Sequence, residues 1–174
     1  MRIHNNTNFT EGKDYQCVFY GGRLLSNLSL DDENELVNLM NVNRNAIIVL
    51  DSDKKSNNTP LNKTKKRILE EAEKNGILVW VTKGREIENY MPELLIKKKY
   101  NKEKSRFHFG QFQNLEEFID KLKKGEGNKF LRDKTYFAKN IMDNCTWDDL
   151  KTNYDLDKMI CKVENKIIEW NNDK

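Results

Sequence analysis

Three short apolar runs with a helix-like segment between each pair constrain the fold of this chain most. The runs are YQCVFY (15–20), AIIVL (46–50) and ILVWV (77–81), and each is continuous rather than alternating with polar residues. Continuous runs rich in β-branched and aromatic residues are typical of parallel strands that are covered on both faces. We therefore expect three buried parallel strands.

The two segments between these runs have helical patterns. Residues 29–41 (SLDDENELVNLMN) begin with Ser29 and Asp32 in an arrangement like a capping box, and apolar residues follow on one face. Residues 62–76 (NKTKKRILEEAEKNG) place apolar residues on one face and end in an Asn-Gly stop signal. The order strand, helix, strand, helix, strand predicts a parallel α/β sheet with right-handed crossovers.

The pattern becomes helical after residue 110. Three segments have apolar residues at helical spacing: 114–125, 133–144 and 155–170. The first of them pairs Asn114 with Glu117 as a predicted capping box. We expect an α/β core over residues 1–110, flanked by helices, and a C-terminal helical extension over 111–174 that packs on the same domain.

Composition limits the class of protein. A length of 174 residues suits one domain, and a net charge of +3 does not by itself indicate nucleic-acid binding. The three cysteines are odd in number and lack metal-ligand spacing, so we expect no disulfide framework. No apolar run reaches the length of a membrane span, and the first residues lack the apolar core of a signal peptide. These features predict a soluble, cytoplasmic protein without a membrane partner.

Acidic residues follow two of the predicted strands. Asp51 and Asp53 come after AIIVL, and Glu86 and Glu88 come after ILVWV. Open α/β sheets bind ligands at the carboxyl ends of their strands, where these four residues would meet. Carboxylates this close repel one another unless a cation lies between them, and their hard oxygens suit Mg²⁺ or Mn²⁺. The alternative is structural, because aspartates form turns and acidic residues favour the first turn of a helix.

A basic run interleaved with aromatic residues, IKKKYNKEKSRFHF (96–109), follows the third strand. It could track a phosphate backbone and stack on splayed bases, although a solvated linker has the same composition. Arg23, in FYGGRLL (19–25), could also meet a phosphate, whereas a plain turn would equally explain its glycines. The candidate DNA-binding residues are Arg23, Lys97, Lys98, Lys99, Lys102, Lys104 and Arg106.

Three of these stretches resemble a known family. FYGGRLL (19–25), IIVLDSDK (47–54) and VTKGREIENY (81–90), in this order, look like the Toprim nuclease domain of the OLD (overcoming lysogenization defect) family of ATP-dependent endonucleases. The resemblance covers residues 15–95 and extends less sharply to DKTYFAKNI (133–141). It implies a Toprim-like parallel sheet and hydrolysis of DNA phosphodiesters by a two-metal site, in a family associated with phage defence.

The resemblance also assigns roles to particular residues. Asp51 and Asp53 match the D-x-D metal ligands of the family, and Glu86 and Glu88 match the acids after the next strand. Lys134 matches an active-site lysine, which would neutralise charge on the scissile phosphate as a catalytic residue. The implied cofactor is Mg²⁺ or Mn²⁺, and the implied substrate is DNA.

The chain departs from the family pattern at two points. It lacks the strand that ends in a glutamate within a "VEG" setting, and it has no G-x-x-x-x-G-K-[ST] motif of an ATPase. The resemblance therefore implies the C-terminal portion of such a nuclease, with an ATPase domain or subunit acting in trans. The alternative is a catalytically incomplete Toprim remnant that binds DNA or a protein. A haloacid dehalogenase-type phosphatase is a third possibility, but its motif expects Thr or Val where Lys55 stands.

Overall fold

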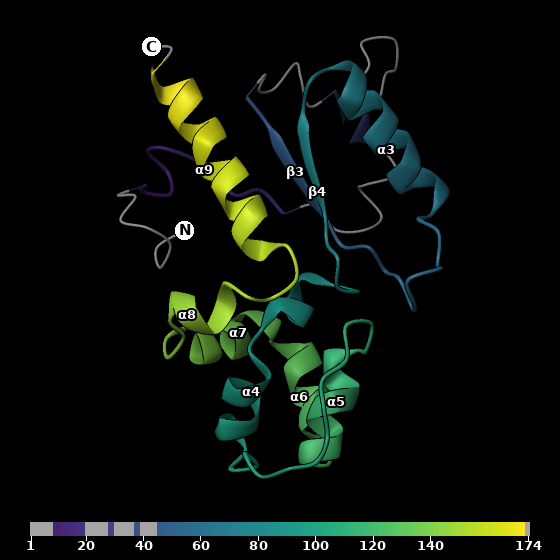
Figure 1. Ribbon diagram of the computed structural model, residues 1–174, viewed down its shortest axis with the longest axis vertical. Coiled ribbons are helices and arrows are strands. Elements are labelled where there is room, and N and C mark those ends of the chain that lie inside the picture. The colour runs from purple at the N-terminus through teal and green to yellow at the C-terminus, as the bar shows by residue number, and fades with distance from the viewer. Residues whose placement is uncertain (1–8, 20–27, 30–36, 39–44, 173–174) are drawn as a thin grey trace. The chain divides into compact units, whose positions relative to one another are not determined.

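The computed structural model describes residues 9–19, 28–29, 37–38 and 45–172 (Figure 1). The chain forms two compact units, and each is built from segments that are distant in sequence. The first unit contains Met1–Leu50, Pro60–Val81 and Met159–Lys174. The second unit contains Asp51–Thr59 and Thr82–Lys158.

The first unit is built around a strand-helix-strand motif. β3 (Ile47–Leu50) and β4 (Leu78–Val81) pair in parallel, from Ile47 opposite Leu78 to Leu50 opposite Val81. The helix α3 (Lys63–Lys74) connects them and packs against the sheet (Figure 1). Two of the predicted strands and the helix between them are therefore confirmed, and the chain is mixed α/β as expected.

Local sequence explains where α3 begins and ends. The Asn62 side chain accepts a hydrogen bond from Lys65 N at 2.9 Å and so caps the first turn. The helix ends at Asn75, and Gly76 adopts a φ of 66° that a glycine takes without strain. On the inner face Ile68 and Ala72 are buried with strand residues, which supplies the apolar contact that holds helix and sheet together.

The prediction of a strand at residues 15–20 is wrong for the part that the structure describes. Residues 16–19 form no strand, and Tyr15 makes only an isolated bridge to Glu11 across a turn. Val18 is 64% exposed and Phe19 is 93% exposed. A short run rich in apolar and aromatic residues is consistent with a strand, but it forms one only where a neighbouring strand pairs with it. Tyr20 lies outside the described residues.

The prediction of a helix at residues 29–41 is wrong at each residue that the structure describes. Leu28–Ser29 and Val37–Asn38 form two short strands, β1 and β2, which pair in parallel. Pairing between backbones has overridden a helical pattern whose β-branched and amide residues are weak helix formers. The other residues of that segment lie outside the described part of the chain.

The second unit is mainly helical (Figure 1). Its helices are η1 (Ile87–Tyr90), α4 (Glu93–Lys99), α5 (Leu115–Leu122), α6 (Glu126–Arg132), α7 (Lys134–Met142) and α8 (Trp147–Leu150). The predicted apolar stripe of α5 is confirmed, and it forms one buried core with Ile96 of α4, Phe130 of α6 and Phe137 of α7. Residue 110, where we expected the core to give way to an extension, lies inside this unit.

Two details of the helices differ from expectation. Asn114 does not cap α5 with a side-chain oxygen; its Nδ2 instead donates to Glu117 Oε1 at 3.4 Å. The short helices η1, α4, α6 and α8 were not predicted, because segments of four to seven residues carry too few periodic positions to be recognised. The predicted helices near residues 133–144 and 155–170 are confirmed as α7 and α9 (Leu156–Asn172).

Within the described residues, no helix is long and apolar enough to cross a membrane. The longest, α9, has 17 residues and carries charged side chains along its length.

Candidate functional site

Two loops continue from the carboxyl ends of β3 and β4 and are joined by hydrogen bonds. Ser52 N donates to Thr82 Oγ1 at 2.9 Å, and Ser52 Oγ donates to the Gly84 carbonyl at 2.6 Å. Asp53 N donates to the Arg85 carbonyl at 2.9 Å. Ser52 and Thr82 are each only 3% exposed, so these bonds are shielded from water. The first loop and its acidic residues are therefore held against the second.

The second loop is itself held by a buried amide. The Asn89 side chain accepts from Glu86 N at 2.8 Å, and its Nδ2 donates to the carbonyls of Gly110 and Gln113. A Cβ at Gly84 would lie 2.6 Å from Asn89 Cβ, so only glycine fits at that position. Asn89 thus ties the acidic loop to the segment that precedes α5.

Asp51 and Asp53 take different positions in this arrangement. Asp51 Oδ1 accepts a hydrogen bond from Ile87 N at 2.7 Å, which joins the carboxylate to the start of η1. Asp53 adopts a φ of 53°, a left-handed conformation that aspartate tolerates better than most residues, and it is exposed. The structure therefore brings Asp51 to the REIENY segment and leaves the Asp53 residue largely in solvent.

Lys134 joins Glu86 and Glu88 from the start of α7. Asp133 caps this helix by accepting from Tyr136 N at 2.8 Å, and Lys134 is its first residue. Lys134 Nζ lies 2.7 Å from Glu88 Oε1 and 3.7 Å from Glu86 Oε2. The predicted catalytic lysine and two of the predicted metal ligands are therefore in direct contact, across 46 positions of sequence.

Glu86 carries the clearest electrostatic signature of the cluster. Burial raises the pKa of its carboxyl above the ordinary value, and the charge of Glu88 raises it further. Lys134 opposes this effect, whereas Asp51 and Glu116 add to it. The pKa of Glu86 is thus raised although Lys134 and Arg85 each lie 3.7 Å from one of its oxygens.

The pKa of Lys134 is raised, whereas burial without an acidic partner would lower the pKa of a lysine. Burial lowers the pKa, but the hydrogen bond to Glu88 and the charges of Glu88, Glu86 and Glu116 together raise it above its usual value. Lys134 therefore remains protonated at neutral pH and acts as a fixed positive charge within the cluster.

Glu116 belongs to the site although the sequence did not indicate it. It lies in the first turn of α5, and its charge affects both Glu86 and Lys134. An acid in the first turn of a helix is expected from the helix dipole alone, so the sequence offered no further signal. Asn89 lies in the REIENY segment that the sequence singled out, but its bonds to the carbonyls of Gly110 and Gln113 follow only from the tertiary structure.

The carboxylates suit a divalent cation in chemistry but do not form a ready-made metal site. Their oxygens are the ligands that Mg²⁺ and Mn²⁺ prefer, and the pKa of Glu86 is raised by burial and then by the charge of Glu88, which a cation would offset. Among the described residues, however, no group of three or more His, Cys, Asp or Glu side chains is arranged to hold a metal ion. In the part of the chain that the structure describes, the cations beside these carboxylates are side chains: Lys134 Nζ lies 2.7 Å from Glu88 Oε1, and Lys134 Nζ and Arg85 Nε each lie 3.7 Å from a Glu86 oxygen.

The basic run does not form a single exposed surface. Lys97 is 5% exposed, because its Nζ pairs with Glu93 Oε1 at 2.6 Å and donates to the Ser105 carbonyl at 3.1 Å. Lys99 Nζ lies 5.4 Å from the centre of the Phe137 ring, which is within cation–π range. Lys99 is nevertheless exposed, as are Lys98, Lys102, Lys104 and Arg106. Arg23 lies outside the described residues.

Comparisons with known proteins assign no family to this chain. A scan against protein-family models found no match, and searches of curated proteins and of solved structures found none.

Proposed function

We propose that this chain provides the Toprim-like part of a Mg²⁺- or Mn²⁺-dependent DNA endonuclease. The observation that carries the proposal is the hydrogen bond from Ile87 N to Asp51 Oδ1 at 2.7 Å. It brings Asp51, which follows one parallel strand, beside the acids that follow the next, at the edge where α/β sheets bind ligands. The ATPase partner that the family resemblance implies would act in trans.

The residues of the cluster would have distinct roles in such an enzyme. Asp51, Asp53, Glu86 and Glu88 would be the oxygen donors for the cation, which would supply an activated water and charge stabilisation. Lys134, which lies 2.7 Å from Glu88 Oε1, would be the positive charge that stabilises a scissile phosphate. For Glu88 to bind a metal ion, its carboxylate must exchange Lys134 for that ion.

One observation favours a second candidate, a DNA- or protein-binding subunit without catalysis. Lys134 already neutralises Glu88 at 2.7 Å, and no ready-made metal group exists among the described residues. In this state, Lys134 and Glu88 form an ion pair that has a structural role. The second candidate would then use the exposed lysines of the basic run for binding and would need no cation.

Metal binding and DNA nicking, measured together, separate the two candidates. Isothermal titration with Mn²⁺ on the purified chain is expected to show binding that the double variant Asp51→Asn, Glu86→Gln weakens at least tenfold. Nicking of supercoiled plasmid in Mn²⁺ should fall in parallel. Asp143→Asn, an exposed aspartate after α7, is the matched control and should change neither result.

The outcome that contradicts the nuclease proposal is specific. If Mn²⁺ does not bind, or if the double variant nicks plasmid as well as the parent does, the acidic cluster is not a catalytic metal site. Circular dichroism of each variant establishes that the loss does not come from unfolding.

A further inference from the structure

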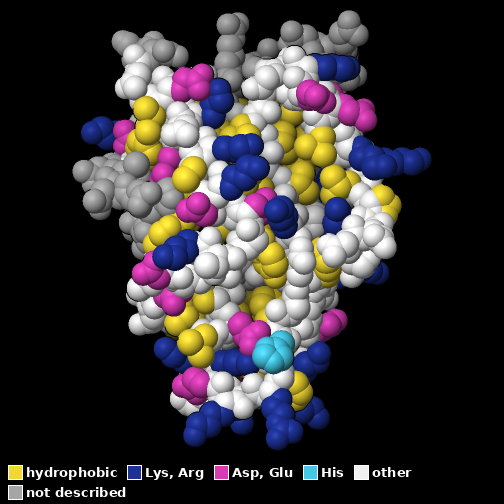
Figure 2. Space-filling view, viewed as in Figure 1, with side chains coloured by type: hydrophobic (Ala, Val, Ile, Leu, Met, Phe, Trp, Pro, Cys, Tyr) yellow, Lys and Arg dark blue, Asp and Glu magenta, His cyan; other side chains and the backbone are white. Residues whose placement is uncertain are grey.

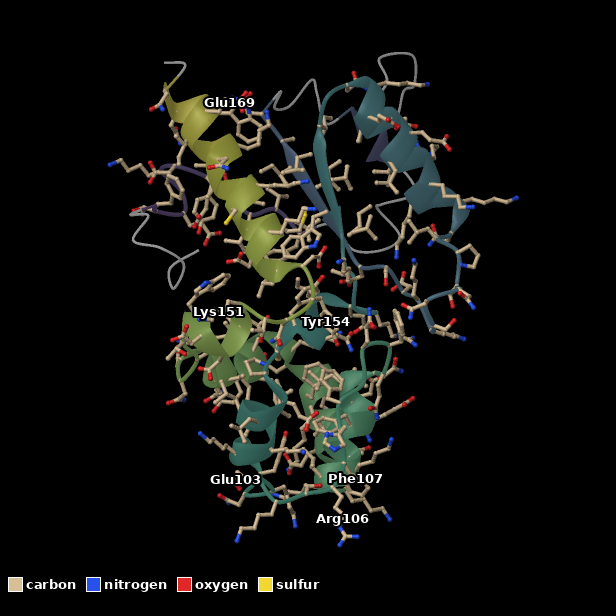
Figure 3. All side chains as sticks on the ribbon, in the orientation of Figure 1. Glu103, Arg106, Phe107, Lys151, Tyr154 and Glu169 are labelled. Carbon is tan, nitrogen blue, oxygen red and sulfur yellow. The ribbon has the colours of Figure 1, made fainter. Side chains whose placement is uncertain are left out.

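A basic surface lies at the end of the second unit away from the acidic cluster. We call it the basic tip; it is formed by the connection from α4 to α5 and by the turn from α5 to α6. Figure 2 shows Lys and Arg side chains gathered at the lower end of the view, and Figure 3 places Arg106 and Phe107 there. Its exposed basic residues are Lys102, Lys104 and Arg106 in the connection and Lys123 and Lys124 in the turn.

The helix α5 separates the basic tip from the acidic cluster. Glu116, in its first turn, acts on Glu86 and Lys134, whereas Lys121 lies in its last turn. A helix rises 1.5 Å per residue, so the turn at Lys123 is about 10 Å along the axis from Glu116. The two charged regions therefore occupy opposite ends of the same helix.

Tyr100 joins the α4–α5 connection to the region of the α5–α6 turn. Its ring packs on the apolar core that contains Leu122 at the end of α5 and Phe130 of α6. Burial raises the pKa of Tyr100 to about 12, and the charges of Glu126 and Asp120 contribute. The lysines of the turn therefore lie on the same side of the unit as the connection that carries the basic run.

The charges at the centre of the basic tip have few acidic neighbours. Residues 97–106 contain six basic residues and one acid, Glu103. Within the described residues, Lys102, Lys104 and Arg106 form no ion pair, in contrast to Lys123, which pairs with Glu126 at 3.4 Å. Like charges held together without partners fit a polyanion, because binding relieves their repulsion and releases counterions.

An aromatic ring projects from the same connection. Phe107 is 48% exposed, and the side chain of the adjacent His108 is 83% exposed. The backbone beneath it is anchored, since the buried Lys97 donates to the Ser105 carbonyl and Phe107 N donates to Ser105 Oγ. An exposed ring on a fixed backbone is suited to stacking with a nucleic-acid base.

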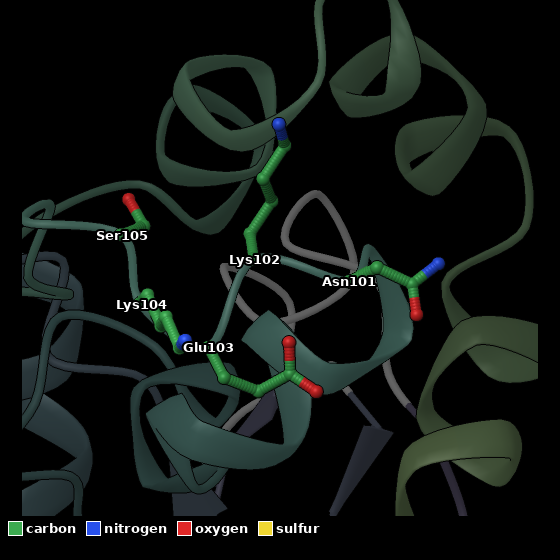
Figure 4. Close-up of a pocket in the computed structure, with 5 residues that line it drawn as sticks. All are labelled: Asn101, Lys102, Glu103, Lys104 and Ser105. Atoms are coloured by element: carbon green, nitrogen blue, oxygen red, sulfur yellow. The ribbon is translucent and has the colours of Figure 1, made fainter.

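Residues that precede Phe107 in the sequence line a shallow hollow. It is lined by Asn101, Lys102, Glu103, Lys104 and Ser105 (Figure 4). Two ammonium groups, an amide and a hydroxyl in one open hollow can contact a phosphate or a sugar, and Glu103 is the single opposing charge. The basic tip thus combines polar groups that can contact a nucleic-acid backbone with an exposed ring that can stack on a base.

We propose that the basic tip binds single-stranded DNA, with Lys102, Lys104 and Arg106 on its phosphates and a base stacked on Phe107. A single strand is required because the base faces of a duplex are covered by their neighbours. The choice of DNA rests on the proposed function and names its substrate class. The surface itself follows from the charge and exposure of these residues.

Fluorescence anisotropy with labelled oligothymidine and with a duplex of equal length, both in EDTA, tests the proposal. Phe107→Ala is expected to weaken single-strand binding about tenfold, as loss of one stacked base would, and to leave duplex binding unchanged. Phe107→Trp should retain binding. Lys104→Ala should lower the slope of log affinity against log salt concentration by about 0.7, the value for one lost phosphate contact.

Matched controls come from the same chain. Leu131 is 49% exposed in the same unit, so Leu131→Ala removes a comparably exposed apolar side chain. Lys66→Ala removes an exposed lysine of α3. Both controls should bind the single strand like the parent chain.

Two results would overturn the proposal: equal weakening by Phe107→Ala and Leu131→Ala, or duplex binding that is as tight as single-strand binding. Because EDTA removes every divalent cation, the assay is independent of the metal chemistry. Single-strand binding without nicking would contradict only the nuclease proposal, and nicking without Phe107-dependent binding would contradict only this one.

Discussion

The acidic cluster and the basic tip lie at opposite ends of α5 and hold their charges in different ways. In the cluster, Glu88 has a side chain that is 12% exposed and pairs with Lys134, and Asp51 is bonded to a backbone amide. At the tip, Lys102, Lys104 and Arg106 extend into solvent. Removing a partly buried charge changes the free energy of unfolding. Removing an exposed charge has little effect on stability and mainly changes the affinity for a binding partner. Substitutions should therefore alter stability at one end and binding at the other.

The largest expected effect comes from the packing that supports the acidic loop. Gly84→Ala places a methyl group 2.6 Å from Asn89 Cβ, so the loop or the amide must shift. We expect a loss of about 1–3 kcal/mol in the free energy of unfolding, measured by urea denaturation. Gly110→Ala is the control, because its nearest contact would be an ordinary 3.7 Å. Equal effects of the two variants would show that the Asn89 contact does not constrain the loop.

Breaking the ion pair should have a smaller effect. Glu88→Gln removes the charge that holds Lys134 at 2.7 Å, and we expect a loss of about 0.5–1.5 kcal/mol at neutral pH. A double-mutant cycle with Lys134→Met measures the coupling directly. Since the pKa of Lys134 is raised by folding, the stability from this pair is present at neutral pH and is lost as pH rises through that pKa. Additive effects of the two substitutions would contradict the pairing.

The same cluster should contain one charge whose removal stabilises the protein. The pKa of Glu86 is raised above 4.5 in the folded state, so the folded chain binds this proton more tightly than the unfolded chain does. Its contribution to stability therefore falls as pH rises from 4.5 through the folded pKa. Glu86→Gln is expected to raise the free energy of unfolding by about 0.5–1 kcal/mol at pH 7 and to have little effect below pH 4.

The control for this substitution is Glu73→Gln on α3, an exposed position outside the cluster, which should show no such gain. Denaturation curves at several pH values provide the measurement. A Glu86→Gln variant that is less stable than the parent at pH 7 would indicate that Lys134 more than compensates for the neighbouring acids.

The smallest effect on stability is expected at the basic tip. Lys102→Ala and Arg106→Ala should each change the free energy of unfolding by less than about 0.5 kcal/mol, because both side chains are exposed and form no ion pair with a described residue. Thermal unfolding monitored by circular dichroism would detect a larger change. A marked destabilisation would mean that these side chains support the fold, and the contrast between the two ends of α5 would fail.

The sequence predicted the parts of the fold that depend on local pattern. The apolar runs of β3 and β4, the capped helix α3 and the apolar stripe of α5 each repeat a signal over several residues. Short segments carried too little signal: the run at residues 15–19 contains exposed Val18 and Phe19, and α6 and α8 went unrecognised. Whether these short segments form a helix, a strand or an exposed loop depended on tertiary contacts.

For the candidate site, the sequence by itself determined which charges exist and that acids follow β3 and β4. Parallel strands end at a common edge, so the approach of Asp51 to the second acidic loop could be predicted from order alone. Only the tertiary structure decided that Lys134 pairs with Glu88 and that the charge of Glu116 acts on the cluster. It also decided that Lys97 is buried while Lys102 and Lys104 remain exposed. The reason is that the residue type sets the charge of a side chain, whereas its burial and its ion-pair partner depend on how helices that are distant in sequence pack together.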